Sequence, residues 1–171
     1  MAVTEELVAA NKQFAETFDQ GDLPMPPARQ VAVLTCMDAR LHPEKFLGLG
    51  IGDAHVIRNA GGRASDDAVR SLIISSQLLG TTEYVVIHHT DCGMLTFSND
   101  DLRQKLVDQT GVDASHIDFL PFNDLEESVR DDVQRLQQSQ FVPNGISVRG
   151  FVYDVRTGLL SAVEAHQGAS V

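Results

Sequence analysis

Two short segments carry the residue types and spacing that could do chemistry: Cys36-Met37-Asp38-Ala39-Arg40 and His88-His89-Thr90-Asp91-Cys92-Gly93. Each follows an apolar run rich in β-branched residues, 31–35 and 83–87, and such runs predict central parallel strands covered on both faces. Open α/β sheets place their sites just past the carboxyl ends of such strands. Both cysteines of the chain and one histidine are therefore expected to meet at one sheet edge: Cys36, His89 and Cys92.

Two thiolates and one imidazole form a ligand set that suits zinc and leaves one tetrahedral position open. His89 and Cys92 can face one metal from a single turn, and Cys36 would come from a neighbouring strand. A bound zinc withdraws charge from its water, so hydroxide becomes available near neutral pH. We therefore expect one zinc ion per subunit. The alternatives are cysteines that act as small buried hydrophobes and a redox pair, which the absence of Cys-x-x-Cys spacing disfavours.

Asp38 and Arg40 lie two and four residues after the first cysteine, close enough to act at the open position. Asp38 could ligate the metal and close the site, or accept a hydrogen bond from hydroxide and orient it. A bidentate pair with Arg40 favours the second role, because it holds the carboxylate ionised and away from the metal. An ordinary surface salt bridge is the alternative for this Asp-x-Arg pattern.

The neighbouring polar residues are harder to assign from sequence. Three histidines, His42, His55 and His88, could shuttle protons, although for each one individually a structural role is favoured. Asp91 is expected to cap or brace its own loop rather than to bind metal.

Composition bounds the class of protein. The chain has 171 residues, 43% of them hydrophobic and 22% charged, which is typical of one globular domain with a substantial core. The net charge of −11 argues against a nucleic-acid partner. No apolar run approaches the roughly 18–20 residues that span a bilayer, and the acidic N-terminus is unlike a signal peptide. Together with the two widely spaced cysteines, these features predict a cytoplasmic protein without a membrane partner.

The elements that must position the site alternate between helices and strands. An amphipathic helix is predicted over residues 4–18, followed by a Pro-rich arm to about residue 28. Further helices are predicted from Pro43, over 65–79, within 100–109 and over 124–138, the second of these capped by Ser65 and ended by Gly80. The strands are expected at 30–35, 54–59, 83–87, 146–153 and 159–163.

This alternation predicts an α/β fold over residues 1–171, a single domain with a mostly parallel central sheet flanked by helices. The expected strand order is 2-1-3-4, with an antiparallel edge strand 5. It places the switch point between the two strands that end in the ligand segments. The N-terminal helical arm, residues 1–28, could pack on a neighbouring subunit or fold back on its own domain.

The segments quoted above, with His55-Val56-Ile57-Arg58-Asn59-Ala60-Gly61 and the strand Val148-Arg149-Gly150-Phe151-Val152-Tyr153-Asp154, resemble a β-class carbonic anhydrase along nearly the whole chain. The resemblance implies Cys36, His89 and Cys92 as zinc ligands and Asp38 with Arg40 as the catalytic dyad. It also implies a homodimer or dimer of dimers, in which the N-terminal helix packs on the partner.

Two departures point to the compact archaeal and actinobacterial branch. Gly50 stands where plant-type members carry a substrate-contacting Gln, and the chain contains no Trp, so a Trp-containing bicarbonate pocket is absent. The expected reaction is reversible hydration of CO2 to bicarbonate and a proton. The alternatives are hydrolysis of carbonyl sulfide or carbon disulfide at the same site, because that branch resembles such enzymes, and a closed structural or sensing metal site with Asp38 as fourth ligand.

Overall fold

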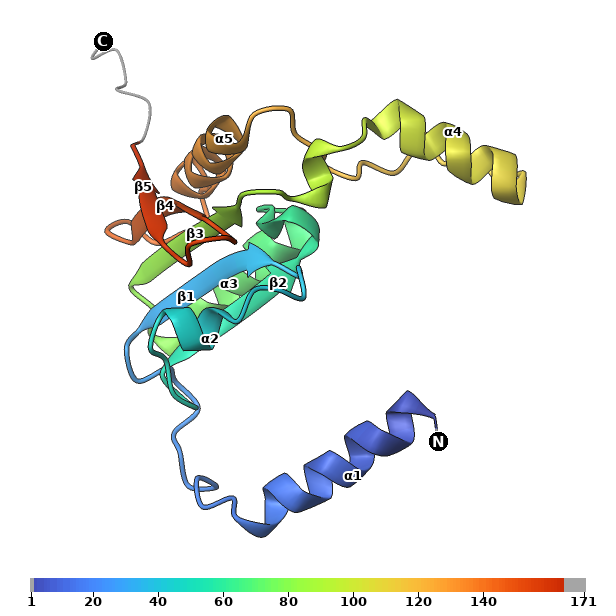
Figure 1. Cartoon of the computed structure of the whole chain (residues 1–171). Helices are drawn as coiled ribbons and strands as arrows, with labels where there is room; N and C mark the ends of the chain where they lie inside the picture. The colour runs from blue at the N-terminus through green and yellow to red at the C-terminus, as the bar shows by residue number, and fades with distance from the viewer. Residues whose placement is uncertain (1, 165–171) are drawn as a thin grey trace.

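Five strands form one sheet in the order β2-β1-β3-β4-β5. The computed structural model describes residues 2–164, and Figure 1 shows the sheet with its helices. Neighbouring strands β2, β1, β3 and β4 are parallel, and β5 pairs antiparallel with β4 at the edge. The predicted strand order and the α/β fold class are therefore confirmed. The strands are β1 (Val31–Cys36), β2 (Ala54–Asn59), β3 (Glu83–His89), β4 (Ser147–Tyr153) and β5 (Leu160–Val163).

Helices and short 3-10 turns fill the connections between the strands. They are α1 (Val3–Glu16), α2 (Pro43–Phe46), η1 (Ala60–Gly62), α3 (Asp66–Leu79), η2 (Gly93–Leu95), α4 (Asn99–Thr110) and α5 (Leu125–Gln137). Across residues 2–164, no helix combines the length and the apolar character needed to cross a membrane.

The main core lies between the sheet and the helices α3 and α5. It joins Leu34 of β1 and Val86 of β3 to Leu72 of α3 and to Val129 and Leu136 of α5. Helix α3 begins and ends where its sequence predicts: Ser65 accepts a hydrogen bond from the Ala68 N–H, and Gly80 ends the helix in the left-handed conformation. A second, smaller cluster contains Cys36, Leu41, Cys92, Met94 and Phe122, and it lies around the predicted site.

One predicted helix differs from its expected extent, and another is very short. Helix α1 begins at Val3, after Ala2 as N-cap, and ends at Glu16, so the predicted range of 4–18 was too long at its end. Helix α2 is a single turn, because Gly48, at φ 63°, turns the chain into the left-handed region directly after it.

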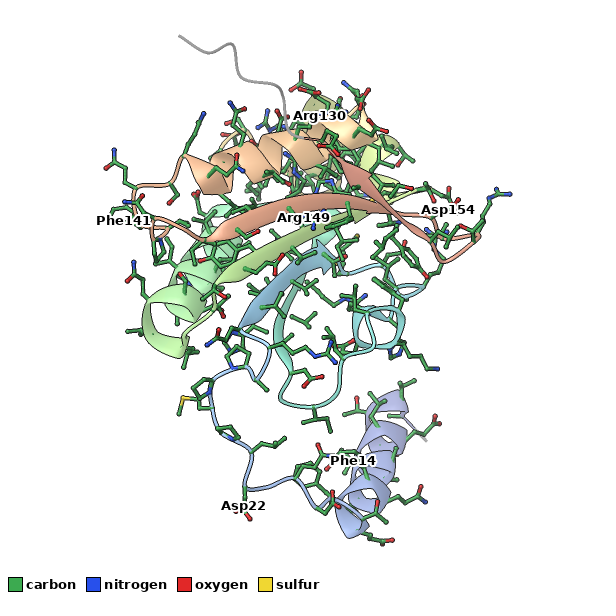
Figure 2. The ribbon with its side chains drawn as sticks, turned by 90° about the vertical axis from the view of Figure 1, so that its left-hand side faces the viewer. Phe14, Asp22, Arg130, Phe141, Arg149 and Asp154 are labelled. Carbon is green, nitrogen blue, oxygen red and sulfur yellow. The ribbon has the colours of Figure 1, made fainter. Side chains whose placement is uncertain are left out.

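Helix α1 stands apart from the sheet and its helices, with the connecting arm between them (Figures 1 and 2). None of the α1 residues is buried within the described chain. Its apolar residues are left in solvent: the exposed fraction is 65% for Leu7 and 54% for Phe14. An isolated helix of this length is marginal in water, so α1 lacks within this chain the packing that would stabilise it.

Candidate metal centre

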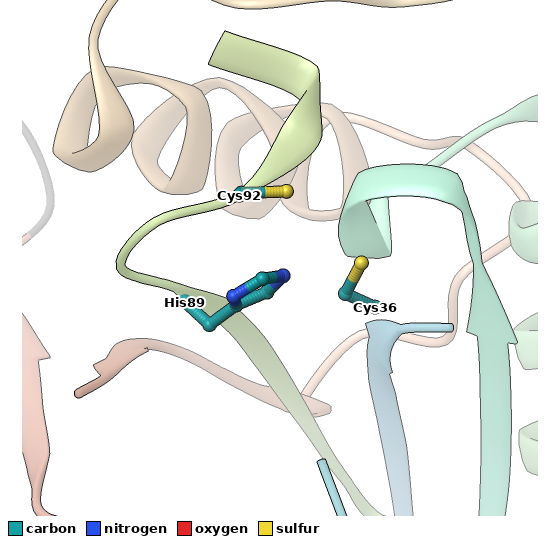
Figure 3. Close-up of side chains that lie close together, drawn as sticks. All are labelled: Cys36, His89 and Cys92. Atoms are coloured by element: carbon teal, nitrogen blue, oxygen red, sulfur yellow. The ribbon is translucent and has the colours of Figure 1, made fainter. Parts of the chain in front are cut away.

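The three predicted ligands come together at the carboxyl ends of two adjacent strands. β1 ends at Cys36 and β3 ends at His89, and the two strands are paired in parallel register up to Thr35 and Ile87. Cys92 follows on the loop after β3 (Figure 3). The two sulfur atoms and a ring nitrogen of His89 all lie within 4.8 Å of one another, and the three residues are buried. Within residues 2–164, this is the group of side chains arranged to hold a metal ion.

The imidazole of His89 is oriented toward the centre of this group. Its Nδ1 lies 2.8 Å from the Thr90 carbonyl oxygen. A carbonyl can only accept, so Nδ1 donates, and Nε2 is left with its lone pair free. Nε2 is buried and has no hydrogen-bond partner in the described chain. An unpaired buried nitrogen is costly, and a metal ion at this position would satisfy it. The residues therefore fit a metal.

The contact between the two buried thiols shifts their pKa values in opposite directions. A hydrogen bond from Cys92, and smaller contributions from His89 and from the backbone N–H groups of Asp38 and Gly61, lower the pKa of the Cys36 thiol. The same contact raises the pKa of the Cys92 thiol, because Cys92 then faces a thiolate. A divalent cation between the two sulfur atoms would favour the thiolate form of both cysteines.

Asp38 and Arg40 form the predicted bidentate pair beside this group. Arg40 Nε donates to Asp38 Oδ1 at 2.9 Å, and Arg40 Nη2 donates to Asp38 Oδ2 at 2.7 Å. Asp38 Oδ2 lies 3.8 Å from the free Nε2 of His89, so the pair adjoins the metal position rather than a distant surface. The Arg40 guanidinium holds the pKa of the Asp38 carboxyl well below its usual range. Asp38 is therefore an anion with a fixed orientation at neutral pH.

Two contacts at the site were missed by the sequence reasoning. Asp91 was predicted to brace its own loop, but its carboxylate Oδ2 accepts a hydrogen bond from Arg40 Nη1 at 2.7 Å. Arg58, the penultimate residue of β2, donates to the carbonyl oxygens of Cys36 and Asp38 at 3.0 and 2.7 Å. The sequence held a signal for Asp91, because it lies between two candidate ligands on the loop after β3, and β3 neighbours β1, whose following loop carries Arg40.

Two of the three candidate proton-shuttle histidines make internal contacts. His88 is fully buried, with Nδ1 2.7 Å from Ser128 Oγ and Nε2 3.1 Å from Asp132 Oδ2. His55 Nδ1 lies 2.7 Å from Ser75 Oγ, and His42 is exposed before α2. A shuttling role for any of them stays a prediction.

A cavity of about 440 Å³ opens beside the three ligands. Cys36, Cys92 and Asp38 line one part of it, and the rest is mostly apolar, with Met37, Met94, Phe97 and Ala60. Such a lining suits a small, uncharged molecule next to a few polar groups.

Comparisons with known proteins agree with this geometry. The family model described as carbonic anhydrase matches residues 31–160. β-Carbonic anhydrase 1 of Mycobacterium tuberculosis is 47% identical over 165 residues, which cover 95% of this chain and 99% of that protein. The carbon disulfide hydrolase of Saccharolobus solfataricus is 34% identical, covering 78% of this chain and 76% of that one. The crystal structure of carbonic anhydrase from Streptococcus mutans aligns with a TM-score of 0.91 at 48% identity, covering 96% of this chain and 99% of that chain.

The match with the family model, the similarity of sequence over nearly the full length and the shared fold all point the same way. The resemblance predicted from the two ligand segments is confirmed. The chain therefore belongs to the carbonic anhydrase family of enzymes, in its β class.

Proposed function

We propose that this chain catalyses the reversible hydration of carbon dioxide to bicarbonate and a proton, with a zinc ion held by Cys36, His89 and Cys92. The observation that carries the proposal is the free, buried Nε2 of His89, which faces two thiols and lies 3.8 Å from the Asp38 carboxylate. When bound there, zinc would act as a Lewis acid that makes a water molecule acidic at the fourth position.

The residues around that position have separate tasks. Asp38 accepts a hydrogen bond from the attacking oxygen nucleophile and so directs a lone pair toward the substrate carbon. Arg40 keeps Asp38 ionised and turned away from ligation. The apolar part of the cavity receives the uncharged CO2, and the negative charge of Asp38 favours departure of the bicarbonate anion. The proton lost from water leaves for bulk solvent, so CO2 and H2O give HCO3⁻ and H⁺.

The test is stopped-flow CO2 hydration from about pH 7 to 9 on protein whose zinc content has been measured. We expect rapid turnover by the wild type. Asp38→Asn should keep its zinc and lose about 100-fold or more in kcat, the scale of general acid–base contributions. Asp67→Asn, which alters an exposed carboxylate on α3, is the matched control and should behave as the wild type. Full zinc occupancy without hydration, or undiminished turnover by Asp38→Asn, would contradict the proposal.

Carbonyl sulfide or carbon disulfide is the alternative substrate. The similarity to a carbon disulfide hydrolase favours this second candidate, since the same metal chemistry adds water to a carbon–sulfur double bond. The discriminating experiment incubates the zinc-loaded protein with each gas and measures released sulfide. Sulfide release that exceeds CO2 hydration in kcat/KM would make the sulfur gases the preferred substrates.

We further propose that the working unit is a homodimer, alone or paired as a dimer of dimers, in which the arm of residues 1–28 packs on a second copy. The exposed apolar side chains of α1, including Leu7 and Phe14, support this arrangement. Light scattering should give a dimer or tetramer mass for the full chain, and removal of residues 1–28 should lower that mass or the stability of the assembly.

The proposed location is the cytoplasm, because two ligating thiols need reducing conditions.

A further inference from the structure

Arg40 binds two carboxylates at once. Its Nε and Nη2 donate to Asp38, its Nη1 donates to Asp91 Oδ2 at 2.7 Å, and its Nη2 also donates to the Asp91 carbonyl oxygen at 2.9 Å. All three nitrogens of the guanidinium are therefore engaged. The planar fork of an arginine suits this use, because its donors point in fixed directions.

The contact joins the two loops that carry the metal ligands. Arg40 lies four residues after Cys36, on the loop from β1, and Asp91 lies between His89 and Cys92, on the loop from β3. Asp91 adopts φ 55°, a left-handed conformation that aspartate and asparagine tolerate better than most residues. Arg40 also lowers the pKa of the Asp91 carboxyl, so this residue is an anion at neutral pH.

The pair of Asp38 and Arg40 would be less constrained without this second carboxylate. The Arg40 side chain is 48% exposed and has several rotatable bonds. Without the Asp91 carboxylate, only the single bond from Nη2 to the Asp91 carbonyl oxygen would hold it on the far side from Asp38, and the two side chains would swing together more easily. Such a swing matters here, because Asp38 Oδ2 is already within 3.8 Å of the free His89 nitrogen. A short rotation would bring a carboxylate oxygen to the open metal position.

We propose that Asp91 is a positioning residue, whose carboxylate anchors Arg40 in the orientation that keeps Asp38 beside the open metal position but off the metal. The inference rests on the metal site of the proposed function. Asp91 acts through Arg40 and needs no contact with substrate. Its carboxylate is 72% exposed, so a contact with stability as its sole effect would be weak. The expected effect is instead on access to the metal.

The experiment measures azide binding to the cobalt(II)-loaded full-length protein by its visible absorption. Azide competes for the open position, so it binds more weakly whenever Asp38 occupies the metal. Asp91→Asn keeps the shape and the backbone conformation, and Asp91→Gly removes the side chain at a φ that glycine accepts. Both should raise the azide dissociation constant about two- to fivefold, the upper part of the range of one exposed ion pair. Loss of the negative charge of Asp91 would by itself lower the azide dissociation constant, because azide is an anion. A rise in that constant therefore distinguishes the proposed role from a simple charge effect.

The same substitution made in an Arg40→Gln protein tests whether Asp91 acts through Arg40. In Arg40→Gln protein, where Asp38 is already released, Asp91→Asn should cause no further rise in the azide dissociation constant. Asp67→Asn is the control, because Asp67 forms an exposed ion pair of similar length, 2.8 Å, with Arg70 on α3. This variant should leave azide binding unchanged. An unchanged or lowered dissociation constant in both Asp91 variants, or a rise of equal size in the Arg40→Gln background, would overturn the inference.

The azide measurement does not depend on CO2 turnover. A wild-type protein that binds cobalt and azide but hydrates no CO2 would refute the proposed function and leave the role of Asp91 to be decided by the variants. Conversely, rapid CO2 hydration by the wild type with unaltered azide binding in the variants would retain the function and reject the role of Asp91.

Discussion

Gly62 offers a sharp test of how closely the backbone is packed behind the metal ligands. It ends the turn η1 at φ 69°, and a Cβ atom added there would lie 2.9 Å from both the Cys36 nitrogen and the Thr35 carbonyl carbon. The carbonyl oxygen of Ile87 would be 3.1 Å away. These neighbours are backbone atoms of two central strands, so no side chain can rotate to relieve the contact.

The cost of Gly62→Ala therefore has two parts. The left-handed conformation costs a residue with a Cβ about 1–2 kcal/mol, and overpacking a tightly packed interior costs about 1–3 kcal/mol more. Gly80 is a matched control, because it has φ 75° and nothing within 4 Å of its added Cβ. Gly80→Ala should thus lose about 1–2 kcal/mol, and Gly62→Ala about 2–5 kcal/mol. Any entropic gain in the unfolded chain is common to both variants.

The assay is urea unfolding of the metal-free proteins, followed by competitive zinc titration. The difference between the two variants in free energy of unfolding isolates the steric part. Because the clash displaces the Cys36 backbone, Gly62→Ala should also bind zinc more weakly than Gly80→Ala. The reasoning is refuted if Gly62→Ala is no less stable than Gly80→Ala and binds zinc with the same affinity.

Three further predictions concern the groups around the site. Asp132 is buried, and its carboxylate lies 3.0 Å from Arg63 Nε and 3.1 Å from His88 Nε2. Asp132→Ala should therefore lower the free energy of unfolding by about 3–5 kcal/mol. The control is Asp131→Ala at the exposed neighbouring residue, which should change this free energy by about 0.5 kcal/mol or less. The folded-state pKa of Asp38 is depressed by Arg40, so the stability from this pair is present above the unfolded pKa of about 3.9 and is lost as pH falls through the lower folded value. The difference in urea midpoint between the metal-free wild type and Asp38→Asn should therefore begin to narrow below about pH 4 and keep narrowing as the pH falls further, and a difference of constant size over that range would contradict this linkage. Free zinc at 100 times its dissociation constant should raise the free energy of unfolding of the wild type by about 2.7 kcal/mol. A thermal-shift titration with zinc checks this, and in the same titration the melting temperature of Cys92→Ala should change little.

Much of the fold was predictable because its signals are local. The apolar runs before Cys36 and before His88 locate β1 and β3, and Ser65 and Gly80 mark the ends of α3. Where local signals conflict, the prediction was less accurate. Pro43 marks the start of α2, but no end was predicted for it, and Gly48 at φ 63° leaves it a single turn.

The amino-acid sequence by itself determined which residues meet at the candidate metal centre. Parallel strands end at one sheet edge, so two ligand segments that follow such strands must be neighbours, and an Asp-x-Arg pair just after the first ligand is local enough to be read directly. The structure brings Cys36, His89 and Cys92 together and pairs Asp38 with Arg40, as expected, while their roles as ligands and catalytic residues stay a prediction.

Only the tertiary structure decided how that centre is braced. The bond from Arg40 to Asp91 joins residues 51 positions apart, and those from Arg58 reach back across 22 and 20 positions to the end of β1 and to the loop after it. Such contacts depend on strand twist, on loop conformation and on the left-handed turn at Asp91, which together set the directions of the side chains. Residue type and spacing predict the topology but not the directions of the side chains. The contact between Arg40 and the Asp91 carboxylate therefore becomes apparent only in the folded structure, where the two loops are neighbours.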